Sequence, residues 1–182
     1  THRKVVVDAG HGGTDAGAKR AGIKESEIVL RVATELHRLL SEDSRFASYL
    51  SRKADQNMSL EDRTQFAVKT KADIFVSIHA NSAPDARIYG AEIYFQNQLP
   101  PDQETLYLAN RENDGSTKEK NKEVGDVNSI IKDLEKHHQT MLSFHLAKDL
   151  HKNWPRRKNG RVHVRQAPFH VLTEMTIPSV LV

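Results

Sequence analysis

Short apolar runs alternate with amphipathic segments through the first half of the chain. The runs at 5–7, 74–78 and 91–95 have the length and β-branched content of buried strands. Residues 26–40 carry apolar side chains at helical spacing, and Ser59 stands where a helix-capping residue would begin a second helix. This alternation predicts an α/β fold built on a mostly parallel sheet.

Three weaker runs, at 47–51, 162–164 and 169–172, predict further short strands. The last residues, 177–182, have the character of another buried strand, and the chain stops there without a following helix. We therefore expect one domain over residues 1–182 that is incomplete at its C-terminal end, with the sheet truncated at its last strand.

The segment 96–140 differs from the rest because charged and amide residues dominate it. Its first part, 99–126, contains two glycine breakers and predicts a loop. Its second part predicts a helix with one apolar face. The apolar positions at the start of that helix are Val127, Ile130, Ile131 and Leu134.

Composition narrows the class of protein. A chain of 182 residues with 37% hydrophobic and 28% charged residues suits one globular domain. No apolar run approaches the roughly 18 residues that a membrane-spanning helix needs. The net charge of +3 comes from scattered basic residues apart from a cluster at 154–158. Without a basic stripe or a recognisable module we expect no nucleic-acid partner, whereas an anionic polymer such as cell wall fits the charge.

The absence of cysteine means that any metal must be held by His, Asp or Glu. His11 and His79 each follow a predicted buried strand, and ligands gather at the carboxyl ends of strands in open α/β sheets. Helix starts lie at the same edge, which makes Glu25 the third candidate. Alone, either histidine would more often be an ordinary polar residue, and Glu25 a helix-terminal charge. Their joint placement favours a metal-dependent hydrolase.

Residues beside these candidates suggest how the site is shaped. Glycines at 10, 12 and 13 would let the backbone turn sharply off the first strand and leave space above the His11 ring. Asp8 and Asn81 are candidates to orient the two imidazoles by hydrogen bonding.

Several segments together closely resemble the zinc-dependent N-acetylmuramoyl-L-alanine amidases of bacterial cell-wall remodelling. They are residues 7–18, 24–28, 59–63, 72–81, 168–172 and 177–182. The resemblance implies a twisted, mostly parallel sheet with helices on both faces, and Zn²⁺ held by His11, Glu25 and His79. It also implies hydrolysis of the amide between N-acetylmuramic acid and L-alanine in peptidoglycan, in the periplasm or cell envelope.

One element of that family pattern is missing from this chain. The resemblance places the catalytic glutamate just after the segment that matches 179–182, so the catalytic residue is expected beyond Val182. Glu174 matches only a loop position before that strand. Glu92, on a predicted strand, is a candidate substrate-binding residue. We expect this chain to bind zinc and to hydrolyse poorly.

The segment 96–140 resembles an insertion in division-associated amidases, in which a helix covers the zinc cleft until an activator protein displaces it. A carboxylate on such a segment could take the water position on zinc, and Glu112 is the candidate, with Glu123 and Glu135 behind it. The alternative is that these are ordinary solvated acids. The apolar positions from Val127 onward then either pack on the domain or form the docking face for the activator.

Two other functions remain open. The chain could be a non-catalytic peptidoglycan-binding or regulatory module, which keeps the groove and lacks the chemistry. It could also be a zinc peptidase or another small-amide hydrolase on a related sheet, which would cleave peptide bonds in substrates that contain no glycan.

Overall fold

The computed structural model describes residues 2–81, 90–96, 103–113, 127–155 and 161–182. A six-stranded sheet forms the centre, in the order β4-β1-β5-β8-β6-β7. Its strands are β1 (Arg3–Ala9), β4 (Phe46–Leu50), β5 (Ile74–Ile78), β6 (Gly90–Phe95), β7 (Arg161–Gln166) and β8 (Ser179–Leu181). A small hairpin of β2 (Lys19–Arg20) and β3 (Ile23–Lys24) stands apart from it.

The sheet is mostly parallel, as the sequence predicts. β4, β1, β5 and β8 run parallel, β6 is antiparallel to β8, and β7 is parallel to β6. The final apolar run forms β8 between β5 and β6. Val182 follows it, accepting a hydrogen bond from the backbone N–H of His79 at 2.8 Å and donating its own to Ser77 O at 2.9 Å.

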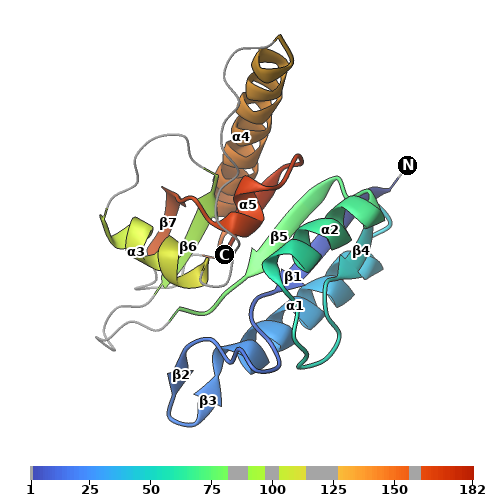
Figure 1. Cartoon of the computed structure of the whole chain (residues 1–182). Coiled ribbons are helices and arrows are strands. Elements are labelled where there is room, and N and C mark those ends of the chain that lie inside the picture. The colour runs from blue at the N-terminus through green and yellow to red at the C-terminus, as the bar shows by residue number, and fades with distance from the viewer. Residues whose placement is uncertain (1, 82–89, 97–102, 114–126, 156–160) are drawn as a thin grey trace.

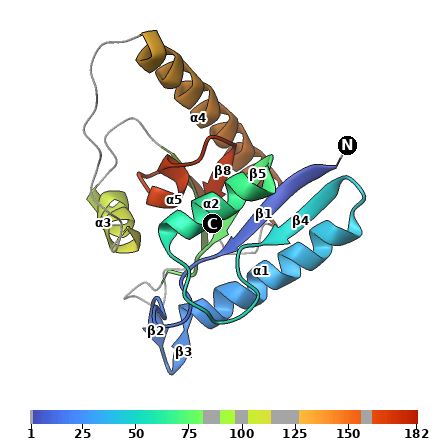
Figure 2. The same ribbon diagram turned by 45° about the vertical axis from the view of Figure 1, so that its right-hand side comes forward.

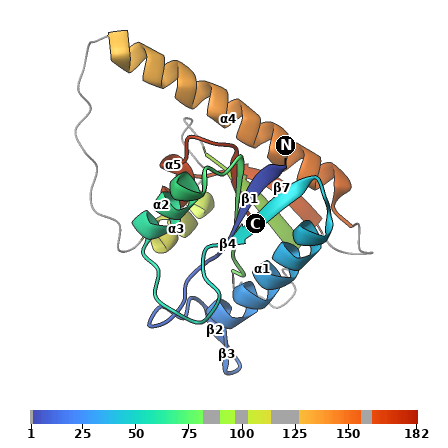
Figure 3. The same ribbon diagram turned by 90° about the vertical axis from the view of Figure 1, so that its right-hand side faces the viewer.

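Helices cover both faces of this sheet (Figures 1 and 3). They are α1 (Glu25–Glu42), α2 (Leu60–Thr70), α3 (Gln103–Glu112), α4 (Val127–Asn153) and α5 (His170–Thr173). Val5 and Val7 of β1 pack with α1, whereas Val6, between them, packs on the opposite side with α2, α3 and α5. The period of two along the strand thus divides the core between the two faces.

The two helices predicted in the first half are present. Ser59 caps α2 by accepting a hydrogen bond from Asp62 N at 3.0 Å. In α1, Val29 and Ala33 are fully buried, whereas Val32 is 48% exposed. A helix this close to the sheet edge buries a narrow stripe, and Val32 lies outside it.

Two segments differ from the sequence prediction. Residues 103–112, expected within a loop, form the helix α3, because Thr105 and Ala109 on one side are buried against the domain. Residues 169–172, expected as a strand, instead enter α5, where Thr173 N donates to Phe169 O at 2.9 Å. In both cases tertiary packing overrides a weak local preference.

The described side chains that anchor the long helix α4 to the sheet lie in its C-terminal half. Ala147 and Phe144 pack against β6 and β8, whereas the N-terminal part extends beyond the sheet (Figures 1 and 2). There Ile131 is 49% and Leu134 65% exposed, and the side chains of Val127 and Ile130 lie outside the described residues. Within the described ranges, no helix is long and apolar enough to cross a membrane.

Candidate metal centre

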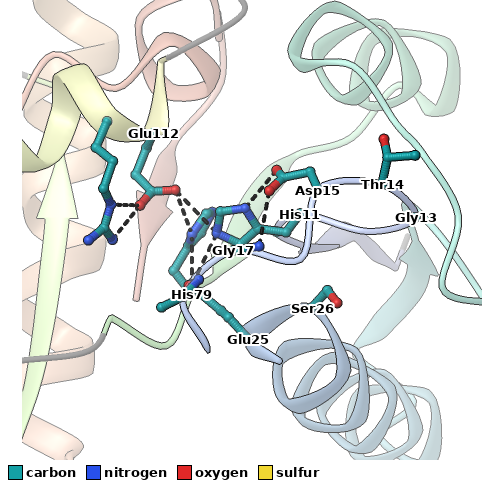
Figure 4. Close-up of polar contacts among 12 residues, drawn as sticks. His11, Gly13, Thr14, Asp15, Gly17, Glu25, Ser26, His79 and Glu112 are labelled. Atoms are coloured by element: carbon teal, nitrogen blue, oxygen red, sulfur yellow. Dashed lines mark hydrogen bonds and ion pairs between the residues drawn. The ribbon is translucent and has the colours of Figure 1, made fainter. Parts of the chain in front are cut away.

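The three residues proposed as metal ligands meet at one edge of the sheet (Figure 4). His11 follows β1 and His79 follows β5, and these strands are neighbours, with Ala9 paired to Ile78. Glu25, the first residue of α1, places Oε1 3.2 Å from His11 Nε2 and 3.4 Å from His79 Nδ1. One ligand atom from each of the three lies within 4.8 Å of the others.

The backbone around β1 explains how both rings fit. His11 adopts a left-handed conformation with φ of 55°, and Gly12 follows at 125°, so the chain turns off the strand at once. Gly10 serves a different purpose, since a methyl group there would lie 2.6 Å from Cε1 of His79. The missing side chain at Gly10 lets the His79 ring lie directly against the backbone.

Both oxygens of Glu25 are also fixed by backbone donors. Oε1 accepts a hydrogen bond from Ala80 N at 2.8 Å, and Oε2 accepts one from Ala18 N at 2.9 Å. The carboxyl group is almost completely buried, with a side-chain exposure of 1%. A buried carboxylate with two N–H donors is held in one orientation and stays ionised.

Asp15, to which the sequence pattern assigns no role, orients His11. Its Oδ2 lies 2.8 Å from His11 Nδ1, which leaves Nε2 as the nitrogen that faces Glu25. The only sequence signal is the i, i+4 spacing of the two residues. A carboxylate on the second ring nitrogen is the usual partner of a metal-binding histidine.

The expectation that Asp8 orients an imidazole is wrong. Its carboxylate accepts hydrogen bonds from Ser51 Oγ at 2.6 Å, Ser77 Oγ at 2.8 Å and Arg63 Nη1 at 2.6 Å. The reason is the strand period, because residue 8 lies on the same side of β1 as Val6 and faces α2, which carries Arg63.

Two buried arginines hold the loop that carries His11. Arg63 donates to Ala9 O at 2.6 Å and His11 O at 2.7 Å. Arg52 donates to Ala9 O at 2.9 Å and Gly10 O at 2.8 Å. Hydrogen bonds from charged donors are stronger than neutral ones, so these contacts stabilise the strained turn. No local pattern in the sequence predicts either contact, because each arginine acts across more than 40 positions of the chain.

Glu112, the last residue of α3, points into the same cluster from the side opposite Glu25 (Figure 4). Its Oε2 lies 3.2 Å from His11 Nε2 and 3.4 Å from His79 Nδ1, and its side chain is 6% exposed. Arg111 donates to Glu112 Oε1 and to Asn81 Oδ1, each at 2.7 Å. Asn81 therefore lies at the rim of the cluster, where it contacts Arg111.

The remaining candidates lie elsewhere. Glu92, in β6, pairs with Arg165 Nε at 2.9 Å and accepts a hydrogen bond from the Tyr94 hydroxyl at 2.6 Å. Glu135 and Glu174 are exposed, and Glu123 lies outside the described residues.

The carboxylates and imidazoles in the cluster each stabilise the charged form of the other. Burial opposes protonation of His11, but the carboxylates of Glu112 and Glu25 outweigh it and raise its pKa to about 10. The same carboxylates raise the pKa of His79. Burial opposes ionisation of Glu25 and Glu112 in turn, yet the two imidazoles hold both carboxyl pKa values well below the ordinary range. The two carboxylates thus favour a positive charge between them.

The donor set fits a metal ion. His11 Nε2 and His79 Nδ1 are buried, and neither has a hydrogen-bond partner among the described residues. Buried polar nitrogens without a hydrogen-bond partner are rare in protein interiors. Two imidazole nitrogens with one carboxylate oxygen are a ligand set that zinc takes in catalytic sites, where a fourth position stays open.

A cavity of about 160 Å³ adjoins the cluster. Its polar lining residues include His11, His79, Glu112 and Asn113. Its apolar wall is formed by Met58, Leu60, Phe169, Val171 and Leu181. A substrate that reaches the histidines has space beside them, in a cavity lined by both polar and apolar residues.

A His-Glu-His cluster at the carboxyl edge of a mixed α/β sheet is typical of metal-dependent hydrolases. The chain belongs to the N-acetylmuramoyl-L-alanine amidase family, whose model matches residues 5–182. It is 33% identical over 191 residues to N-acetylmuramoyl-L-alanine amidase AmiA of Escherichia coli. That match covers 99% of this chain and 64% of AmiA.

Solved structures agree on the fold. The catalytic domain of CwlV, an amidase from Bacillus (Paenibacillus) polymyxa, matches with a TM-score of 0.61 at 24% identity, over 98% of this chain and 78% of that one. CwlD of Clostridioides difficile, solved in complex with the GerS lipoprotein, matches with a TM-score of 0.61 at 20% identity, over 99% of this chain and 80% of that one. The α/β architecture predicted from the sequence is confirmed.

Proposed function

We propose that this chain is the catalytic domain of a zinc-dependent amidase that hydrolyses the bond between N-acetylmuramic acid and L-alanine in peptidoglycan. The observation that carries the proposal is the buried pair of unpartnered nitrogens, His11 Nε2 and His79 Nδ1, facing the Glu25 carboxylate. Family membership supports the substrate. Cell-wall remodelling, daughter-cell separation and an envelope or periplasmic location follow as parts of the same proposal.

His11, Glu25 and His79 would hold the zinc ion. Bound zinc supplies a Lewis acid that lowers the pKa of a coordinated water to roughly 7 and polarises a carbonyl group. The protein contributes rigidity, since Asp15 fixes the His11 ring and two backbone N–H groups fix Glu25. The cavity beside the histidines would receive the substrate.

Proton transfer needs a base within hydrogen-bond reach of the attacking water. We assign this role to a glutamate that would follow Val182. The backbone supports this position, because Val182 O accepts a hydrogen bond from His79 N at 2.8 Å. A residue after Val182 would therefore begin next to one of the zinc ligands.

Glu112 would act as an autoinhibitory ligand. Its distances of 3.2 and 3.4 Å to the two histidine nitrogens match those of Glu25, so its carboxylate would compete with water for the fourth position on zinc. The segment about 96–140 would then be a regulatory insertion. An activator protein could displace it by docking on exposed apolar residues of α4 such as Ile131 and Leu134. One relative, CwlD, is solved with a lipoprotein partner.

The direct test is zinc stoichiometry by elemental analysis on the purified chain and on the variants His11→Ala, Glu25→Ala and His79→Ala. We expect one zinc ion per chain, lost or greatly weakened in each variant. His151→Ala, at an exposed position of α4, is the matched control and should keep the metal. A folded, metal-supplied chain without zinc would overturn the proposal.

Two assays separate the competing functions. A domain extended past Val182 to include the expected glutamate should release stem peptides from purified peptidoglycan. Binding of peptidoglycan without release would favour a non-catalytic module. Cleavage of peptides that carry no glycan would favour a zinc peptidase.

A further inference from the structure

Asn113, the residue after α3, holds two backbone groups of the segment before α5. Its Nδ2 donates to Pro168 O at 2.8 Å, and its Oδ1 accepts from His170 N at 2.7 Å. A carbonyl and an N–H group two residues apart on one segment are the pair through which a strand binds a single residue of a parallel neighbouring strand. The Asn113 carboxamide thus takes the place of one residue of an extended peptide.

This pairing occurs next to the metal centre. Asn113 directly follows Glu112, and both contribute to the wall of the cavity beside His11 and His79. Phe169, which lies between the two paired backbone groups, forms part of the same wall. A ligand that replaced Asn113 would therefore lie beside the cluster and share its cavity.

We propose that Pro168 O and His170 N form a backbone subsite for the stem peptide, which Asn113 fills in the inhibited chain. One residue of an extended peptide would pair with them through its own N–H and C=O, in the manner of an added β-strand. This inference rests on the proposed amidase function. The insertion would then block the site in two ways, because Glu112 would bind the metal ion and Asn113 would occupy the groups that bind the peptide.

The geometry distinguishes the peptide from the sugar. The acetamido group of N-acetylmuramic acid is a trans amide, whose N–H and C=O point in opposite directions. It cannot satisfy Pro168 O and His170 N together. The N–H and C=O of one residue in an extended chain point to the same side, and can.

The test is a double-mutant cycle between Asn113 and one amide of the ligand, measured as binding by isothermal titration calorimetry. The protein is the chelator-treated chain, in which binding is separated from hydrolysis. The ligands are N-acetylmuramoyl-L-alanyl-D-glutamate and its analogue with an ester oxygen in place of the N–H that follows L-alanine. N-acetylmuramic acid alone is the third ligand.

Asn113→Ala should bind the amide ligand at least about fivefold more tightly than the parent chain, because two hydrogen bonds become available to it. The gain should be at least about threefold smaller for the ester, which cannot donate to Pro168 O, and absent for the sugar alone. Asn110→Ala, which removes the same side chain from the exposed side of α3, should show no gain. Asn113→Asp keeps the acceptor and loses the donor, and should show the same dependence on the ligand amide.

An equal gain for amide and ester would mean that Asn113 only tethers α3, and would overturn the subsite. A gain for the sugar alone would overturn the peptide assignment. The His170 amide resonance in nitrogen-15 NMR spectra should shift on ligand addition to Asn113→Ala, and an unchanged resonance would also count against the proposal. If the chain binds zinc but Asn113 shows no coupling to the ligand amide, the subsite is overturned and the amidase proposal stands. If the coupling is found in a chain that binds no zinc, the subsite stands and the amidase proposal is overturned.

Discussion

Arg63 donates to the backbone carbonyl of His11 at 2.7 Å from a position 52 residues later in the chain. The same guanidinium binds the buried carboxylate of Asp8 at 2.6 Å. One side chain of α2 thus joins the core of the sheet to the turn that presents a proposed zinc ligand. The stability of the domain and the shape of its site depend on the same ion pair.

Arg63→Met should lower the free energy of unfolding by roughly 3–5 kcal/mol, because it leaves the Asp8 charge buried without its partner. Urea denaturation measures this change. Arg38→Met is the control, since Arg38 pairs with Glu35 and Glu42 at the surface of α1. Exposed ion pairs contribute far less to stability than buried ones, so equal losses in both variants would contradict the role of Arg63.

Asp8→Asn should change how stability depends on pH. Burial opposes the charge on Asp8, but Arg63 and the hydroxyls of Ser51 and Ser77 outweigh it and hold its pKa below the ordinary 3.8. A lowered carboxyl pKa contributes stability that is complete above the unfolded value and is lost as the pH falls through the folded one. The deficit of Asp8→Asn in urea titrations should therefore be largest at neutral pH and shrink below about pH 4. A constant deficit from pH 7 to pH 2 would contradict this.

Gly10→Ala should weaken zinc binding by at least about tenfold, because the added methyl group would lie 2.6 Å from Cε1 and 2.9 Å from Cδ2 of His79. Competition with a zinc-sensitive dye measures the affinity. Gly22→Ala adds the same methyl group where no atom lies within 4 Å. It should lower stability, since its φ is 79°, while zinc affinity stays unchanged.

Zinc binding at pH 7 should release at least one proton per ion. His11, with a pKa raised to about 10 by Glu112 and Glu25 against the effect of burial, is protonated in the metal-free chain, and zinc needs the neutral ring. Calorimetry in two buffers of different ionisation enthalpy gives the number of protons. Zinc affinity should accordingly rise from pH 7 to pH 10.

In the metal-free chain, the raised pKa of His11 contributes stability that is complete below pH 6.5 and is lost as the pH rises through 10.

Glu112→Ala should have two opposite effects. Zinc affinity should fall by about tenfold, because a proposed ligand is lost, while hydrolysis of muropeptides by a domain extended past Val182 should rise by about tenfold. Glu104→Ala, which removes a carboxylate that is 83% exposed in the first turn of α3, is the matched control. Hydrolysis that stays constant or falls in a folded Glu112→Ala variant would contradict autoinhibition through this residue.

Local patterns in the sequence predict most of the sheet, the first two long helices and the meeting of His11, Glu25 and His79. These features depend on periodicity and on the rule that parallel strands end at one edge. The role of Asp8 and the arginine contacts could not be predicted in this way, because hydrogen bonds over 40 to 70 positions leave no local trace. The helix α3 could not be predicted in this way either, because its few buried residues find packing partners only in the assembled domain.

The helix α4 packs on the sheet near its C-terminal end, and this affects how the chain responds to force or to a partner near the other end of the helix. Among the described side chains of α4, those that pack on the sheet lie in its C-terminal half, and those at 133–138 are all exposed. Regions with few buried contacts open with a smaller free energy than the core to which they are joined. The turn of α4 at 133–138 can therefore open and re-form while the sheet keeps its protection from exchange, so a partner that binds this turn need not unfold the strands that carry His11 and His79.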